Sequence, residues 1–287
     1  MTSQTEVQLG LDIGATLAKI AVARPQERAE PSLELLSSAD LSAVAAHVAA
    51  LRPERVGVTG GGAARLGPML DCPTHAASEF DAWGAGASRL LADAEGGPAS
   101  GESFLLVSLG TGTSILLVNG EKTTRIGGTA LGGGAVVGLG GALTGAGFKE
   151  LCALAERGDS GAVDLRVSDI YGPDEAPIAG DLTAANFGKL GRDFLHGTAS
   201  DHPSGDDHAN RAAGIMRLVG ENVALICAGL AGATQVRDVV YGGSTLRGNK
   251  RLVEVLSEVT ILCGLQPCFL PHGGFAGALG ALELARV

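Results

Sequence analysis

Four short segments combine glycine with Thr, Ser or Asp where an apolar run ends, and segments of this composition can bind phosphate groups. They are residues 12–16, 60–62, 110–113 and 242–245. Glycine leaves backbone N–H groups accessible and the hydroxyl groups add donors, so such a turn can wrap an anion. One turn alone is compatible with an ordinary β-hairpin. Four of them on alternating strands and helices indicate a nucleotide site.

Four charged residues supply what phosphoryl transfer needs, namely charge neutralisation, a base and a substrate anchor. Asp12 repels phosphate but suits Mg²⁺, which prefers oxygen ligands and keeps several waters. Lys19 can neutralise phosphate charge. Glu79 is the candidate base, although a carboxylate at a helix entrance also serves the helix dipole. Arg125 has the planar fork that matches a carboxylate, so it is the candidate anchor for an acidic substrate.

The elements that carry these residues form a repeated pattern. An apolar run, a Gly/Thr turn and a second apolar run occur at residues 7–23 and again at residues 104–118. Each copy predicts a β-hairpin, and two copies of one unit predict two related halves. The two turns would hold a triphosphate from both sides of a cleft. The segment 104–134, which also contains Arg125 and three consecutive glycines, is the centre of this arrangement.

Further elements follow from hydrophobic periodicity and from capping residues. The predicted helices cover residues 41–51, 84–94, 148–157, 206–231, 251–262 and 275–285, and the further strands cover residues 33–36, 56–58, 239–241 and 268–270. Residues 135–147 have no predicted element. The polar segment 95–102, EGGPASGE, predicts a boundary between a domain of residues 1–100 and a domain of residues 101–287.

Composition excludes several classes. The 287 residues carry a formal charge of −10, which argues against a nucleic-acid footprint. Five scattered cysteines without CxxC predict free thiols in a reducing compartment, and the six histidines show no zinc motif. No basic-then-apolar leader and no apolar run of about 18 residues is present. The chain lacks GxxxxGK[ST] and the Rossmann glycine pattern. We expect a soluble protein of the cytoplasm that binds no nucleic acid and no membrane.

Seven motifs resemble, in order, those of bacterial type II pantothenate kinases, the kind similar to the eukaryotic enzymes. They are DIGATLAK (12–19), SEFDA (78–82), SLGTGTS (108–114), RIGGTALGGG (125–134), GDLTAANFG (180–188), YGGS (241–244) and GGFAGALGALEL (273–284). Together they cover nearly the whole chain. The sequence departs from the family pattern at Ala15, where Gly is common, and at Phe148, where Tyr is usual.

The resemblance implies an α/β, two-domain actin-like ATPase fold of the ribonuclease H-like type, with mixed sheets flanked by helices. It implies phosphorylation of pantothenate with ATP and Mg²⁺, the first step of coenzyme A synthesis, by a homodimer whose C-terminal domain holds the nucleotide pocket and the dimer interface. Glu79 becomes the proton acceptor and Arg125 the pantothenate contact. Implied ATP contacts are Asp12, Gly14, Ala15, Thr16, Lys19, Thr111, Gly133, Gly134, Ala135, Val136, Val137, Phe148 and Ser244, with Asp12 also holding Mg²⁺, directly or through water.

Two alternatives stay open. A sugar or N-acetylhexosamine kinase of the same fold is disfavoured, because the chain has no cysteine-rich zinc motif and no ExGH segment. A nucleotide-binding regulator without turnover is disfavoured by the intact set Asp12, Lys19, Glu79 and Arg125. Residues 181–186 are expected near the dimer interface or a substrate lid.

Overall fold

The protein was analysed as a computed structural model, which describes residues 7–24, 30–99, 101–171, 175–197 and 205–286. Residue 100, at the predicted domain boundary, and residues 1–6, where a leader was sought, lie outside this range. The boundary itself stays a prediction.

Two five-stranded sheets form the framework, and both have the same strand order. The first contains, from edge to edge, β3 (Ser32–Ser37), β2 (Leu17–Ala23), β1 (Gln8–Ile13), β4 (Arg55–Thr59) and β5 (Thr74–Ala76). The second contains β8 (Lys122–Thr129), β7 (Thr113–Asn119), β6 (Phe104–Leu109), β11 (Asp238–Gly242) and β12 (Gln266–Phe269). In each, an antiparallel meander is continued by two parallel strands. The repeated hairpin seen in the sequence therefore extends to a repeated sheet.

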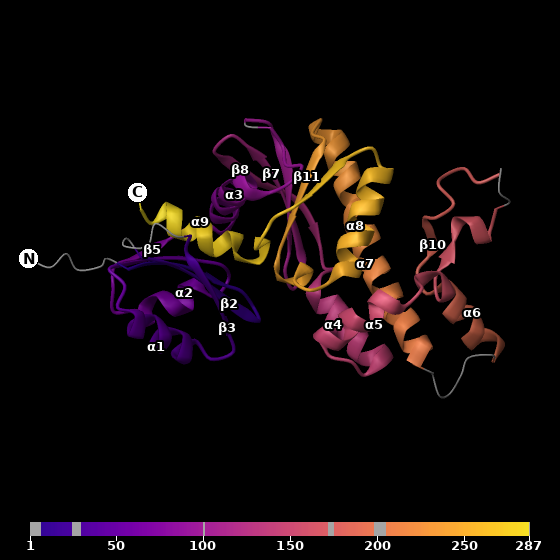
Figure 1. Ribbon diagram of the computed structural model, residues 1–287, viewed down its shortest axis with the longest axis horizontal. Helices are drawn as coiled ribbons and strands as arrows, with labels where there is room; N and C mark the ends of the chain where they lie inside the picture. Colours follow the sequence, from indigo (N-terminus) through magenta and orange to yellow (C-terminus); the bar gives the residue numbers. More distant parts are fainter. Residues whose placement is uncertain (1–6, 25–29, 100, 172–174, 198–204, 287) are drawn as a thin grey trace, which may run out of the picture.

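Helices cover both sheets and separate them (Figure 1). They are α1 (Leu41–Leu51), α2 (Ala63–Leu66), α3 (Glu79–Leu90), α4 (Gly133–Thr144), α5 (Phe148–Arg157), α6 (Gly188–His196), α7 (Gly205–Thr234), α8 (Lys250–Leu262) and α9 (Ala276–Leu284). One apolar cluster joins α1 to the first sheet, a second joins α3 and α9 to the second sheet, and a third joins the second sheet to α4, α5, α7 and α8.

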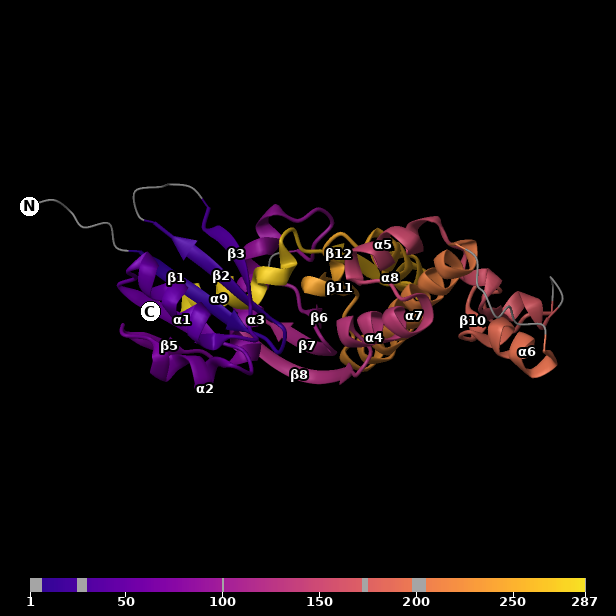
Figure 2. The ribbon, with the colours of Figure 1, turned by 90° about the horizontal axis from the view of Figure 1, so that it is seen from below.

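Helix α9 returns the C-terminal end of the chain to the first sheet. It packs against β1 and β4 on one side and against α3 on the other. Figures 1 and 2 both draw α9 beside the first sheet, among elements from the opposite end of the sequence. The last helix therefore packs between the two sheets and links them.

The helices differ from the sequence-based prediction at α2, α4 and α6, which were not predicted, and at the start of α3. The α3 helix begins at Glu79, whereas a start at Gly84 was predicted. Gly84 and Gly86 weaken helix propensity, yet both lie at close contacts, with Thr123 and with Ala276, so packing outweighs propensity. The α4 helix was not predicted because it is rich in glycine, and Gly140 allows it to pack closely on Leu151 of α5.

By length and composition, α7 is long and apolar enough to cross a membrane, the single such helix in the described part of the chain. More than half of its most apolar window, 56%, is buried within the protein. The buried side chains include Ile215, Met216, Val219 and Val223, which belong to the core of the second sheet.

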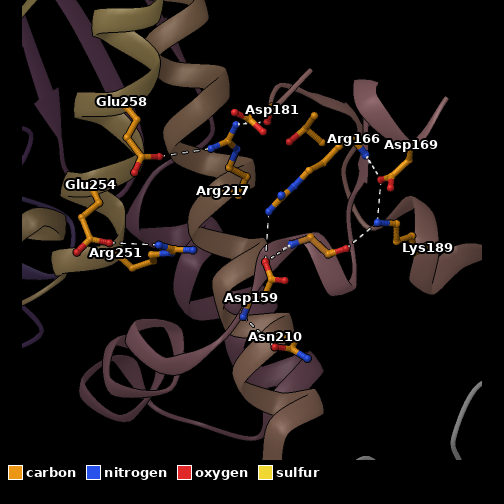
Figure 3. A network of polar contacts seen from close by, with 12 residues as sticks. Asp159, Arg166, Asp169, Asp181, Lys189, Asn210, Arg217, Arg251, Glu254 and Glu258 are labelled. Carbon is orange, nitrogen blue, oxygen red and sulfur yellow. Dashed lines mark hydrogen bonds and ion pairs between the residues drawn. The ribbon is translucent and has the colours of Figure 1, made fainter. Parts of the chain in front are cut away.

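Residues 159–171 and 175–196, here called the distal lobe, lie at the end of the molecule away from the first sheet (Figures 1 and 2). They include β9 (Leu165–Arg166), β10 (Thr183–Ala185) and α6. Polar contacts attach the lobe to α7 (Figure 3). Arg217 donates to the Asp181 carbonyl at 2.8 Å, and buried Glu221 accepts from the Thr183 N–H at 2.8 Å. Buried Asp164 accepts from the Phe187 N–H at 2.7 Å, and burial raises its pKa to about 6.

Candidate functional site

A cleft of about 940 Å³ opens between the two hairpin turns. Both turns line it, as do the turn after β4, the start of α3, the start of α4 and the loop after β11. A volume of this size accommodates a nucleotide together with a small second substrate. The geometry expected from the sequence, two turns that face each other across one cleft, is therefore present.

The cleft brings together all the predicted site residues except Ala135 and Val136. Gly133, Gly134 and Val137 line it, because successive helical residues are about 100° apart and positions i and i+4 share a face. Val136 is fully buried in the core, and Ala135 packs against the same core. Their side chains face away from the cleft.

Asp12 and Lys19 lie opposite each other in the first hairpin, and their side chains form an ion pair at 3.1 Å. Burial raises the pKa of the Asp12 carboxyl, while the Lys19 ammonium acts in the opposite direction. The pair therefore positions a carboxylate and a cation at the base of the cleft.

Two glycines lie directly against the carboxylate of Asp12. A Cβ at Gly60, where φ is +85°, would lie 2.5 Å from Asp12 Oδ1. A Cβ at Gly277 in α9 would lie 2.9 Å from Oδ2. Gly60 belongs to a predicted ligand-binding turn, but the approach of Gly277 could not be read from the sequence. No cluster of three or more His, Cys, Asp or Glu residues occurs among the described residues, so Asp12 does not belong to a metal-binding group of that size.

In the second turn, the carbonyl oxygens are held by internal hydrogen bonds. Gly110 O accepts from the Gly133 N–H at 2.8 Å, Thr111 O accepts from the Gly134 N–H at 2.8 Å, and Gly112 O accepts from the Gly110 N–H at 2.9 Å. Carbonyl oxygens repel phosphate oxygens, and here each has a donor. Within the described structure, the N–H groups of Thr111 and Gly112 have no hydrogen-bond acceptor. The turn is therefore arranged to present donors.

The first turn follows the same rule. Ile13 O accepts from the Gly62 N–H at 2.9 Å, Leu17 O from the Gly14 N–H at 3.0 Å, and Thr16 O from the Ser38 N–H at 3.1 Å. Three of the carbonyls that flank this turn are thus occupied. Both turns combine occupied carbonyls with small or hydroxyl-bearing residues, which is the arrangement that an anion requires.

Glu79 is the first residue of α3 and lines the cleft. Burial is the main cause that raises the pKa of its carboxyl, and the negative charge of Asp12 raises it further, against a lowering effect of Lys19. A carboxylate with a raised pKa is a stronger base than one in water, as a general base requires. The position of Glu79 fits the predicted role.

A β-bulge positions Arg125. Its Cα pairs with Leu116, whereas the preceding residue of β7, Ile115, pairs with Gly127, so residue 126 is inserted. The side chain of Thr123 contacts α3, but Gly127 lies against Leu230 of α7 on the opposite face. Bulges change the face to which a strand directs its residues. This one leaves Arg125 in the cleft, and the Gly127-Gly128 pair is the sequence signal that could have predicted it.

Two threonines lie in the predicted segments 110–113 and 242–245 but were not assigned individually as site residues. Thr113 Oγ1 donates to Leu131 O at 2.7 Å, so its hydroxyl helps to hold the turn 110–113 in place. Thr245 Oγ1 donates to Gly110 O at 2.9 Å. Both line the cleft and both contacts join distant parts of the chain, which a local pattern cannot reveal.

Comparison with known proteins identifies the family. The profile of the Fumble family matches residues 98–283. A type II pantothenate kinase of Staphylococcus saprophyticus is 33% identical over 279 residues, which cover 97% of this chain and 100% of that protein. A type II pantothenate kinase of Staphylococcus haemolyticus is 36% identical, with the same coverage of 97% and 100%.

Solved structures share the fold. The activator of the 2-hydroxyisocaproyl-CoA dehydratase from Clostridium difficile, with bound ADPNP, aligns with a TM-score of 0.62 at 17% identity and covers 97% of this chain and 94% of that one. A ROK family glucokinase from Streptomyces griseus, in complex with glucose and AMPPNP, aligns with a TM-score of 0.59 at 16% identity, covering 98% and 99%. These likenesses establish the two-domain actin-like ATPase fold that the sequence predicted. The family profile and the full-length identities above show that the chain belongs to the type II pantothenate kinase family.

Proposed function

We propose that the protein transfers the γ-phosphoryl group of ATP to the primary hydroxyl of pantothenate and so forms 4′-phosphopantothenate, the first step of coenzyme A synthesis. One observation carries the proposal. In a chain of this family, two phosphate turns, a carboxylate with a raised pKa and an arginine open into a single cleft. These are the parts that phosphoryl transfer needs.

Each residue has one role in this proposal. The N–H groups of the two turns and the Lys19 ammonium bind and neutralise the phosphates of ATP, which lies between the hairpins. Glu79 accepts the proton of the pantothenate hydroxyl, whose oxygen attacks the γ-phosphorus in line as the bond from that phosphorus to the bridging oxygen breaks and ADP leaves. Arg125 binds the pantothenate carboxylate with its planar fork. Gly133, Gly134, Val137, Phe148 and Ser244 shape the nucleotide pocket.

The surroundings of Asp12 fit a hard divalent cation, since its carboxylate lines the cleft and the residues against its two oxygens, Gly60 and Gly277, have no side chain to cover them. Asp12 would hold Mg²⁺ together with phosphate oxygens, directly or through water. When bound, Mg²⁺ neutralises negative charge on the phosphates.

The test is an ATP-consumption assay with pantothenate, glucose and N-acetylglucosamine as separate acceptors. We expect ATP consumption with pantothenate as the acceptor and none with either sugar. Turnover with a sugar would identify a sugar kinase of the same fold, and nucleotide binding without turnover on any acceptor would identify a regulator. Either result would replace the proposed function.

Arg125→Ala should raise the KM for pantothenate about 100-fold, because a charge-assisted bidentate contact contributes on the order of 3 kcal/mol. The KM for ATP should change little. Steady-state kinetics with each substrate varied in turn would measure both constants. Arg237→Ala, which removes an exposed arginine outside the cleft, is the control. An unchanged KM for pantothenate would remove Arg125 from the substrate side.

We also propose a cytoplasmic homodimer. The described cysteines are free thiols, which fits a reducing compartment. Leu225 on α7 and Ile261 and Leu262 on α8 are large apolar residues with 41%, 60% and 51% of their surface exposed. Two neighbouring helices with such residues fit a self-complementary contact. We place residues 181–186 near the dimer interface or near a substrate lid.

In analytical ultracentrifugation, the wild-type protein should sediment as a dimer, and Ile261→Asp should shift it toward monomer. Met69→Asp, at an exposed apolar residue of the first half, should leave the dimer intact. A wild-type protein that sediments as a monomer contradicts the dimer, and an Ile261→Asp dimer of unchanged strength moves the interface elsewhere.

A further inference from the structure

Thr245 connects two segments that are far apart in sequence and adjacent at the cleft. Its side chain is buried, with 4% of the residue surface exposed, and its hydroxyl donates to Gly110 O at 2.9 Å. The same carbonyl accepts from the Gly133 N–H at 2.8 Å. A single oxygen in the turn 110–113, here called the phosphate turn, thus receives one donor from the loop after β11 and one from the start of α4.

The backbone of Thr245 is fixed without its hydroxyl. Gly243, at φ +125°, lies so close to the carbonyl of Leu109 that any Cβ there would collide with it. Asn249 Nδ2 donates to Thr245 O at 3.3 Å, and Asn249 is itself buried. Because other contacts hold the turn Ser244–Leu246 in place, the hydroxyl is available to position Gly110 rather than its own loop.

We propose that Thr245 is a positioning residue for the nucleotide. Its hydroxyl orients the carbonyl of Gly110 away from the cleft, so that the N–H group of Thr111, which lies in the same peptide plane, faces the phosphates. It also couples the turn 110–113 to the neighbouring Ser244, which lines the cleft. The inference rests on the proposed function for the identity of the ligand, an adenine nucleotide, and it does not depend on the acceptor.

The electrostatic reason is the charge of the carbonyl. If Gly110 O loses one of two donors, a rotation of the peptide plane toward the cleft costs less. That rotation would bring a carbonyl oxygen toward a phosphate and turn an N–H group away. An unmade hydrogen bond next to a charged ligand costs more than one elsewhere, since bonds to charged groups are the stronger ones. The loss should therefore appear in nucleotide affinity more than in stability.

The experiment compares Thr245→Val, which keeps the shape and loses the donor, with Thr245→Ser, which keeps the donor. Calorimetric titration with ADP and Mg²⁺ measures the dissociation constant, and thermal unfolding measures stability. We expect Thr245→Val to raise the Kd about tenfold, and Thr245→Ser to stay within about twofold of wild type. In kinetics, Thr245→Val should raise the KM for ATP and leave the KM for pantothenate unchanged.

Thr260→Val is the matched control. Thr260 is fully buried, its hydroxyl bonds the Tyr241 hydroxyl at 2.7 Å, and it does not line the cleft. The Thr260→Val protein should lose about as much stability as the Thr245→Val protein, but its Kd for ADP should equal that of wild type. Equal Kd values for Thr245→Val and wild type overturn the inference, as does an equal effect of Thr260→Val. If ADP affinity depends on Thr245 in this way but the wild-type protein does not phosphorylate pantothenate, the proposed function is contradicted and the inference stands.

Discussion

A Glu79→Gln protein should bind ATP normally and lose about 10²- to 10⁴-fold of kcat, the range of general-base catalysis. The substitution keeps the size of the side chain and removes the proton acceptor. Glu79 is the first residue of α3, lines the cleft and has a raised carboxyl pKa. Titration with ADP would measure nucleotide affinity, and initial rates at saturating pantothenate would measure kcat.

The raised pKa of Glu79 predicts the direction in which kcat changes with pH. Burial and the charge of Asp12 raise the Glu79 pKa, so the carboxyl stays protonated to a higher pH than an ordinary glutamate, whose pKa is about 4.3. A protonated carboxyl cannot accept the substrate proton, so wild-type kcat should fall as the pH drops through this raised pKa. In Glu79→Gln the residual rate should lack that acid limb.

The same shift predicts the stability of the variant. A carboxyl with a raised folded-state pKa disfavours the folded protein above its unfolded-state pKa, because the ionised form is less well accommodated when folded. Glu79→Gln should therefore unfold at neutral pH no more easily than wild type, which separates a lost base from a lost fold.

Asp81→Asn is the control for the helix start. Asp81 lies in the same first turn of α3 but is exposed and does not line the cleft. If the carboxylates served only the positive end of the helix dipole, both variants would lose a little stability and neither would lose turnover. Undiminished turnover in Glu79→Gln would exclude Glu79 as the base.

Much of the framework follows from local pattern. The limits of β2, Leu17–Ala23, and of α5, Phe148–Arg157, agree with the sequence-based prediction, because an apolar run between glycine turns and an amphipathic helix are local signals. The two turns were recognised for the same reason. The repetition of the hairpin also anticipated that both sheets share one strand order.

Features that depend on distant contacts were not predictable. The propensity of glycine argues against α4, and only its packing on α5 explains the helix. The bulge at residue 126 depends on the pairing of β8 with β7, and the bond between Thr245 and Gly110 joins residues 135 positions apart. Sequence pattern therefore identified the residues of the cleft, whereas the contacts that orient them needed the fold.

Gly280→Ala should destabilise the protein by about 3 kcal/mol, the upper part of the range for overpacking. Helix α9 lies between the first sheet and α3, and a Cβ at Gly280 would collide with the carbonyl of Ala82 in α3. Collision with backbone requires that one of two helices move. Urea unfolding measured at constant protein concentration gives the free energy.

Gly141→Ala is the matched control, because Gly141 is exposed in α4 and no atom lies within 4 Å of the added Cβ. Alanine favours a helix over glycine by about 1 kcal/mol, so this variant should be more stable than wild type. The same substitution is thus expected to have opposite signs at two helical positions. A Gly280→Ala protein that is as stable as wild type would contradict the close packing of α9 on α3.

The packing of α9 also bears on catalysis. One of its glycines, Gly277, adjoins the Asp12 carboxylate, and Gly280 adjoins Ala82, one helical turn from Glu79. A displacement of α3 relative to α9 therefore changes the position of the proposed base relative to Asp12. We expect Gly280→Ala to lower kcat even at a temperature where it is fully folded, and Gly141→Ala to leave kcat unchanged. A loss of stability with full kcat would mean that α9 supports the fold without setting the distance between the two carboxylates.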